Sequence, residues 1–145
     1  MSSNETDRWL QRWPDVAGRV NANPPAAQNL AKAARTNVER ARKALADKDF
    51  DAAVIWAELA LVNGADAVLQ RGGVRVRGKE RSHQARFEYP RLPKIFAKNA
   101  GLIGRARGQR NVAAYEGGGR ISRGAADAIV AVAAAATDEV EKQLK

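Results

Sequence analysis

The sequence contains no cysteine and only one histidine, His83. The lack of cysteine excludes disulfides, thiolate nucleophiles and cysteine-ligated zinc. A single histidine leaves no histidine cluster for a catalytic metal, so metal chemistry would have to rest on carboxylates. We therefore expect a protein that uses neither a metal nor another cofactor.

Long apolar runs are also missing. No run approaches the roughly 20 residues that a membrane span needs, because Asp127, Thr137 and Asp138 interrupt even the alanine-rich stretch between them. The first residues lack the basic segment and the apolar stretch of a secretion signal. Together with the missing cysteines, these features favour a cytoplasmic protein that does not contact a membrane.

Positive charge, in contrast, is abundant and concentrated. The 145 residues carry 25 Lys and Arg against 16 Asp and Glu, and residues 71–110 hold twelve of the basic but only two of the acidic side chains. A local excess of this kind favours a polyanion, RNA first or else an acidic protein, held mainly through phosphates; a solvated basic surface is the alternative. The side chains that we expect at a nucleic-acid interface are Arg71, Arg75, Arg77, Lys79, Arg81, His83, Arg86, Arg105 and Arg107.

The spacing of apolar residues predicts an all-α fold, a bundle of four to five antiparallel helices. Residues 26–47 repeat apolar positions with the period of a helix face, after a proline pair that suits a helix entrance. The next helix begins at Asp49, a good N-cap, and ends at Gly72, so these two helices should form an antiparallel hairpin. We expect one domain over 1–145, in which residues 1–25 form an N-terminal extension with a short helix and 26–145 form the bundle.

Glycine and proline residues interrupt the helical pattern in the second half of the predicted bundle. We expect a loop over 72–93 with a short helix around 80–88, then a helix over 93–107. The last helix should begin at the N-cap Ser122. Residues 107–120 would then link the last two helices, and three consecutive glycines place Tyr115 near an exposed end. Many of the predicted core positions are alanine, and such a thin core favours a homodimer.

This order of elements is similar to that of the HEPN domains (higher eukaryotes and prokaryotes nucleotide-binding). The resemblance covers roughly residues 26–144 and rests on a helix pair that ends in glycine, a basic irregular stretch, and the motif residues Arg110, Asn111 and Tyr115 ahead of a last helix. It implies a dimeric helical bundle and a metal-independent endoribonuclease, often a toxin paired with a nucleotidyltransferase antitoxin. By the resemblance, Arg110, Asn111 and Tyr115 are the catalytic positions.

Tyr115 departs from the family pattern, which has a histidine at this position. An unperturbed tyrosine has a pKa of about 10 and is a poor general base at neutral pH, whereas it can still orient a phosphate or stack on a base. His83 is the only ordinary candidate for proton transfer, unless it is a surface or helix-cap histidine. Arg110 and Asn111 can bind and stabilise a phosphate, or else fix the loop by hydrogen bonding to carbonyls at a helix end.

Two readings of function remain open at this point. The first is an RNA-binding, toxin-type ribonuclease. The alternative is a noncatalytic HEPN-like module that binds nucleic acid or a cognate antitoxin, with a scaffold protein that carries a basic surface as a third possibility.

Overall fold

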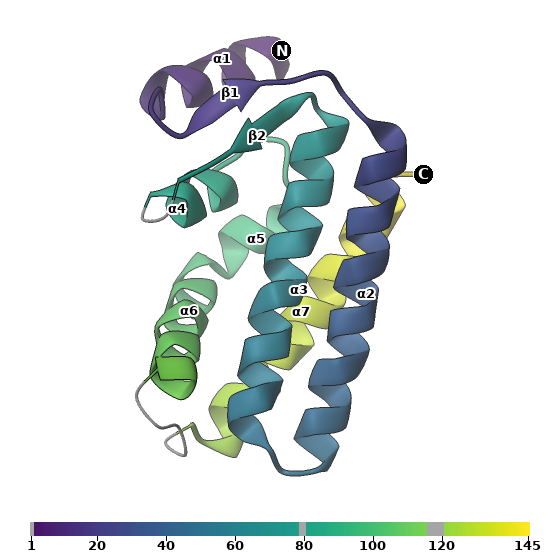
Figure 1. Cartoon of the computed structure of the whole chain (residues 1–145), viewed down its shortest axis with the longest axis vertical. Helices are drawn as coiled ribbons and strands as arrows, with labels where there is room; N and C mark the ends of the chain where they lie inside the picture. The colour runs from purple at the N-terminus through teal and green to yellow at the C-terminus, as the bar shows by residue number, and fades with distance from the viewer. Residues whose placement is uncertain (1, 79–80, 116–120) are drawn as a thin grey trace.

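The computed structural model describes residues 2–78, 81–115 and 121–145, and this part of the chain is mostly helical (Figure 1). An all-α fold is therefore confirmed in its coarse sense, with a small two-stranded sheet added. The elements in chain order are α1 (Ser2–Arg12), β1 (Ala17–Arg19), α2 (Pro24–Ala46), α3 (Phe50–Arg71), β2 (Val74–Val76), α4 (Ser82–Phe87), α5 (Lys94–Lys98), α6 (Ala100–Tyr115) and α7 (Arg123–Gln143).

Each of the three long helices begins after a capping residue, and Asp49 and Ser122 were predicted as two of these caps. The side chains of Asn23, Asp49 and Ser122 each accept a hydrogen bond from the backbone N–H three residues later, at 3.0–3.1 Å. These bonds satisfy N–H groups that a helix start leaves without an internal partner. The predicted hairpin of α2 and α3, and the predicted start of the last helix, are confirmed.

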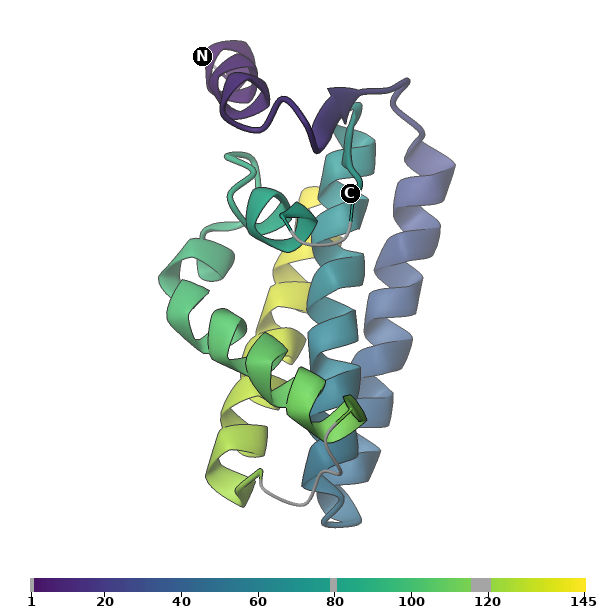
Figure 2. The ribbon, with the colours of Figure 1, turned by 60° about the vertical axis from the view of Figure 1, so that its left-hand side comes forward.

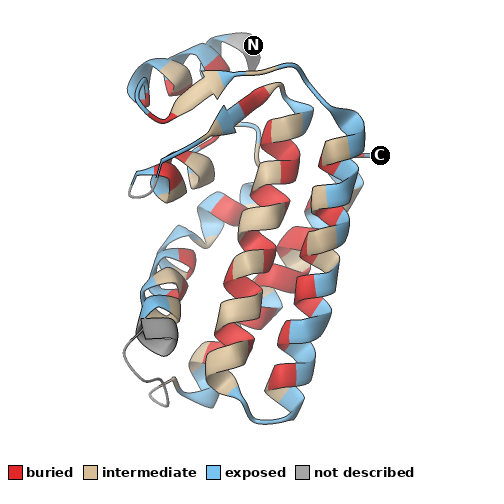
Figure 3. Cartoon of the chain, viewed as in Figure 1, coloured by how far each residue is buried: buried red, intermediate tan, exposed pale blue. Residues whose placement is uncertain are grey.

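α3 is the central helix of the bundle, and it packs against α2, α6 and α7. Buried residues concentrate where α2, α3 and α7 meet (Figure 3). Many of them are alanines, which let helix axes approach closely. Gly64 on α3 extends this pattern, because a Cβ there would lie 3.5 Å from Val140 on α7.

α3 also corrects one expectation about apolar runs. Among the described residues it is the one helix long and apolar enough to cross a membrane by length and composition. However, 61% of its most apolar window is buried inside the protein, as expected for the core helix of a bundle.

The expected loop over 72–93 is wrong for Val74–Val76, which form a strand. β2 pairs antiparallel with β1, so Ala17 lies opposite Val76 and Arg19 opposite Val74. The pairing joins segments far apart in the chain, which the periodicity of either segment alone cannot reveal. Gly73 allows the turn from α3 into the strand, since its φ of 74° lies in the left-handed region.

The first helix packs over the middle of the chain through two tryptophans one turn apart. Trp9 and Trp13 are both 4% exposed, and the indole N–H of Trp9 donates to the carbonyl oxygen of Ala85 on α4 at 2.8 Å. The ring of Trp9 also meets that of Tyr89 edge to face. The N-terminal segment therefore holds α4 in place through β2 and these indoles.

The predicted helix over 93–107 is also corrected. It divides at Asn99 into α5 and α6, and α6 continues to Tyr115. The helix persists beyond residue 107 because Ile103, Ala106 and Arg110 fall on one face, of which Ile103 and Ala106 are buried. Arg110 and Asn111 are thus helical residues and not part of a link between helices. The three consecutive glycines lie outside the described residues.

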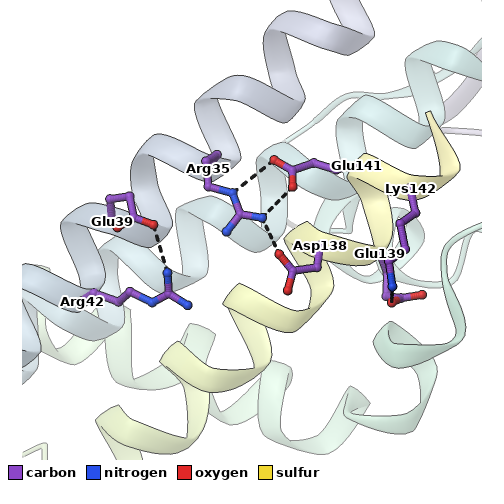
Figure 4. Close-up of polar contacts among 7 residues, drawn as sticks. All are labelled: Arg35, Glu39, Arg42, Asp138, Glu139, Glu141 and Lys142. Atoms are coloured by element: carbon purple, nitrogen blue, oxygen red, sulfur yellow. Dashed lines mark hydrogen bonds and ion pairs between the residues drawn. The ribbon is translucent and has the colours of Figure 1, made fainter. Parts of the chain in front are cut away.

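A charged network joins α2 to α7 across the surface of the bundle (Figure 4). The guanidinium of Arg35 donates to both carboxylate oxygens of Glu141, at 2.6 and 3.1 Å, and also to Asp138. These hydrogen bonds raise the pKa of Arg35, so the side chain remains charged. By contrast, the ion pair of Arg42 in the described part of the chain is with Glu39 on its own helix.

We predict that Arg35→Met lowers the free energy of unfolding by about 1–2 kcal/mol, because it removes charged hydrogen bonds between two helices. Urea denaturation followed by circular dichroism measures this loss. Arg42→Met is the matched control, since it removes an exposed pair within one helix that contributes at most about 0.5 kcal/mol. Equal losses in the two variants would show that the interhelical network adds nothing to an ordinary surface pair.

Candidate functional site around Glu58

Glu58 is a charged residue in the middle of the central helix, and its side chain is only 2% exposed. It lies on the face of α3 that packs inward, between the buried residues Val54 and Leu61. Two side chains from other helices approach its carboxylate. Arg110 Nε on α6 lies 3.8 Å from Oε2, and His83 Nδ1 on α4 lies 3.8 Å from Oε1.

The position of α4 and α6 explains this convergence. Both helices lie on the same side of α3 (Figures 1 and 2), and both pack against it. His83 and Arg110 keep 22% and 27% of their side chains exposed. Each therefore joins the buried carboxylate to the solvent, where a ligand can reach it.

Opposing effects act on the charge of Glu58. Burial raises the pKa of the Glu58 carboxyl, and the positive charges of Arg110, Arg107 and Arg86 lower it. The three arginines thus act as counter-charges to a carboxylate that would otherwise be costly to bury.

Several polar atoms of this cluster are buried without a hydrogen-bond partner in the described part of the chain. They are Glu58 Oε1, His83 Nδ1, Arg86 Nη1, Arg107 Nη1 and Arg110 Nε. Unpaired buried donors and acceptors lower stability and need an explanation. Two of these atoms, Glu58 Oε1 and His83 Nδ1, lie 3.8 Å apart, which is beyond hydrogen-bond distance but close enough for attraction when the histidine is protonated.

A second acid on α3 holds one of the arginines. Arg86 Nε donates to Asp66 Oδ1 at 2.7 Å. Burial raises the pKa of the Asp66 carboxyl, while the charge and hydrogen bond of Arg86 lower it. Only 11% of the Arg86 side chain is exposed. Arg86 therefore neutralises acids inside the bundle and presents little surface to a partner.

A pocket of about 320 Å³ opens beside the cluster, between α4 and α6. His83 and Arg107 form part of its wall. The pocket and the Glu58 cluster therefore share residues, and a ligand in one would touch the other.

The side chains expected at the nucleic-acid interface separate into three groups. Arg86, Arg107 and His83 belong to the Glu58 cluster with Arg110. Arg71 and Arg81 make contacts within the chain, since Arg71 donates to the Leu144 carbonyl and Arg81 to Asp15. Arg75, Arg77 and Arg105 form the third group and are exposed, as are Arg71 and Arg81 despite their contacts.

The structure describes the side chains of two of the three motif positions. Arg110 lies within α6 and at the cluster, next to Glu58. Asn111 is exposed on α6, and Tyr115 is the last residue of that helix. The side chain of Tyr115 and the whole of Lys79 lie outside the described residues.

Sequence reasoning missed Glu58 and Asp66. A usable signal exists, because Glu58 interrupts the apolar face that Val54, Leu61 and Val68 define on the predicted helix. A charged residue at a buried helix position needs a partner of opposite charge. The excess of arginines later in the chain could have been its source.

No three His, Asp or Glu side chains among the described residues lie close enough together to hold a metal ion. Comparison with family models, curated proteins and solved structures finds no match to this chain. The site geometry is therefore the basis for proposing a function.

The raised pKa of Glu58 predicts a pH-dependent stability. The folded state binds a proton at Glu58 more readily than the unfolded chain, whose carboxyl has the ordinary pKa of 4.5. The resulting stability is present below that pKa and is lost as the pH rises through the folded-state pKa.

Compared with Glu58→Gln, which is uncharged at every pH, the wild-type protein should lose unfolding free energy as the pH rises. Urea denaturation of both proteins from about pH 4 to about pH 9 measures the difference between them. A difference that stays constant over this range would contradict the prediction.

Proposed function

We propose that this chain is an HEPN-like RNA-binding protein that cleaves RNA without a metal, at the cluster formed by Glu58, His83 and Arg110. The observation that carries the proposal is that Arg110 and His83, which come from different helices, flank one buried carboxylate. The helical hairpin α2–α3, and the position of Arg110-Asn111 on the helix before the last, support the HEPN-like assignment.

Arg110 is the phosphate ligand in this proposal. A guanidinium can donate two parallel hydrogen bonds to a phosphate, and it stabilises the extra negative charge of a pentacoordinate transition state. Its partly exposed side chain supports this role. The exposed Arg75, Arg77 and Arg105 attract the RNA backbone by charge.

His83 supplies the proton transfer that Tyr115 is poorly suited to perform. With a proton on Nδ1 facing Glu58, the other ring nitrogen, Nε2, is a base. In the proposed step Nε2 takes the proton of a ribose 2′-hydroxyl, and the 2′-oxygen attacks the adjacent phosphorus. The bond from phosphorus to the 5′-oxygen breaks, and that oxygen takes a proton from the histidine. The products are a 2′,3′-cyclic phosphate and a 5′-hydroxyl.

Glu58 positions these two groups and does not touch the RNA. Its carboxylate faces Nδ1 of the histidine on one side and Nε of the arginine on the other. A carboxylate in this place favours one orientation of the imidazole and stabilises the imidazolium that forms during the reaction.

We predict that Arg110→Ala lowers RNA cleavage at least about 100-fold and that His83→Gln lowers it by roughly 10²–10⁴-fold, with unchanged helical content. The assay incubates the purified protein with total bacterial RNA in EDTA and maps the cut ends. Arg42→Ala is the control, since it removes the same charge from an exposed position on α2.

Cleavage by Arg110→Ala at the wild-type rate would show that the site assignment is wrong. RNA that is bound but remains intact with the wild-type protein would favour the noncatalytic module, with a cognate antitoxin as a candidate partner. The search would then turn to that partner.

RNA affinity should fall steeply with salt, because each phosphate contact releases a bound counterion. The log–log slope should be about −0.7 per contact on a single strand, and Arg110→Ala should reduce its magnitude by about one contact. Fluorescence anisotropy with a labelled oligonucleotide from about 50 mM to about 200 mM salt measures both slopes. Absence of binding at the lowest salt would reject RNA as the partner.

A further inference from the structure

The pocket between α4 and α6 has the size and composition of a small-ligand site. Its volume of about 320 Å³ lies near the lower end of the roughly 300–1,000 Å³ typical of such sites. Its apolar wall consists of Phe87, Ala100, Ile103 and Gly104. An apolar pocket with few polar groups suits a flat heterocycle better than a sugar or a phosphate.

Phe87 provides an aromatic surface in a fixed position. Its ring stacks on that of Phe96 with centroids 6.0 Å apart and planes inclined by 22°. Phe96 is itself 2% exposed and thus anchored in the core. A nucleobase gains most from stacking on a ring that is already held in place.

The polar wall carries one group of each charge. Arg107 contributes a guanidinium whose Nη1 is buried and finds no hydrogen-bond partner in the described part of the chain. Glu88 contributes a carboxylate, whose Oε1 is held by Arg12 at 2.9 Å and by the Trp13 indole N–H at 3.2 Å. Its Oε2 accepts one hydrogen bond, from Gln84 at 3.1 Å, and can accept a second from a ligand. These two groups form no ion pair with each other among the described contacts. The pocket therefore offers donors from one helix and an acceptor from the other.

Guanine matches this pair of groups better than the other bases. Its O6 and N7 are adjacent acceptors for a guanidinium, and its N1–H and 2-amino group are adjacent donors for a carboxylate. Adenine and cytosine present an amino group where the guanidinium needs an acceptor. Uracil has acceptors but lacks the second donor.

Gly104 keeps this wall open. It lies within α6, where glycine weakens a helix relative to alanine. A Cβ at this position would meet no other atom within 4 Å, so packing inside the protein does not require the glycine. The open space at this position lets a ligand approach the helix backbone.

We propose that this pocket binds a guanine base of the RNA substrate and thereby selects the nucleotide next to the cleaved phosphate. The proposal rests on the function proposed above. His83 lines the pocket and also faces Glu58, so a base in the pocket would place its neighbouring phosphate beside the cluster. The protein would then cut preferentially next to guanine.

The test compares binding of 2′-fluoro oligouridines, with or without one central guanine, to the full chain. Such oligonucleotides have no nucleophilic hydroxyl and remain uncut. The guanine should tighten binding by roughly 5- to 150-fold, as expected for bidentate base recognition. Replacing it with 7-deazaguanine removes N7, and replacing it with hypoxanthine removes the 2-amino group. Each replacement should lose part of the gain.

Gly104→Leu tests the location, because a leucine side chain would fill the pocket without a backbone clash. The ratio of the two dissociation constants, with and without guanine, should fall to about one. Gly108→Leu is the matched control, since a Cβ there also meets no atom within 4 Å and Gly108 does not line the pocket. Its ratio should equal that of the wild-type protein.

The possible results separate the two proposals. Equal binding of both oligonucleotides by the wild-type protein would overturn guanine selection while leaving RNA binding intact. A guanine preference that persists in Gly104→Leu would overturn this pocket as its source. Failure to bind either oligonucleotide would reject the RNA function itself, and guanine selection with it. Thermal unfolding of both glycine variants verifies that they fold.

Discussion

Burial of the Glu58 carboxylate is the constraint on which the second half of the structure depends. A charge in the interior of a helix bundle is costly unless opposite charges approach it. Here they come from α4 and α6, which contribute Arg86, Arg107 and Arg110. α6 contains three glycines, so its own propensity for helix is low. Attraction between its arginines and Glu58 helps to hold it against α3. The same contacts place the reactive side chains, so in this chain the forces that fix the fold also build the site.

The sequence predicted the helices better than the contacts between distant segments. Caps at Asp49 and Ser122 are local signals, since a side chain bonds a backbone group three residues away, and they located two helix starts correctly. The pairing of β1 with β2 has no local signal and was missed. The helix end at residue 107 was wrong, since α6 continues to Tyr115 and its Arg110 approaches Glu58 on α3, a partner far away in the sequence.

The sequence pointed to individual residues of the candidate site but not to their grouping. Arg110 came from a motif, and His83 came from being the only histidine. Their relation depends on Glu58, which looked like one polar residue in an apolar helix.

The basic stretch was interpreted from the sequence as a single basic surface. Its charges in fact divide between positions held at an acid of the bundle, as for Arg86, and exposed positions such as Arg71 and Arg75. Charge counting along a sequence cannot make this distinction, because the acids that neutralise the arginines lie on other elements.

The N-terminal segment has a consequence for the order in which the protein folds. Trp9 bonds Ala85 and β1 pairs with β2, so this segment closes a loop that contains the whole α2–α3 hairpin. Such a closure is entropically costly and slow compared with formation of a local hairpin. During synthesis this segment leaves the ribosome before α2, yet its docking partners emerge only after α3. We therefore expect a nascent chain in which α2 and α3 are already paired while α1 is not yet docked. The histidine-bearing α4 acquires its final support only when the N-terminal segment packs over it.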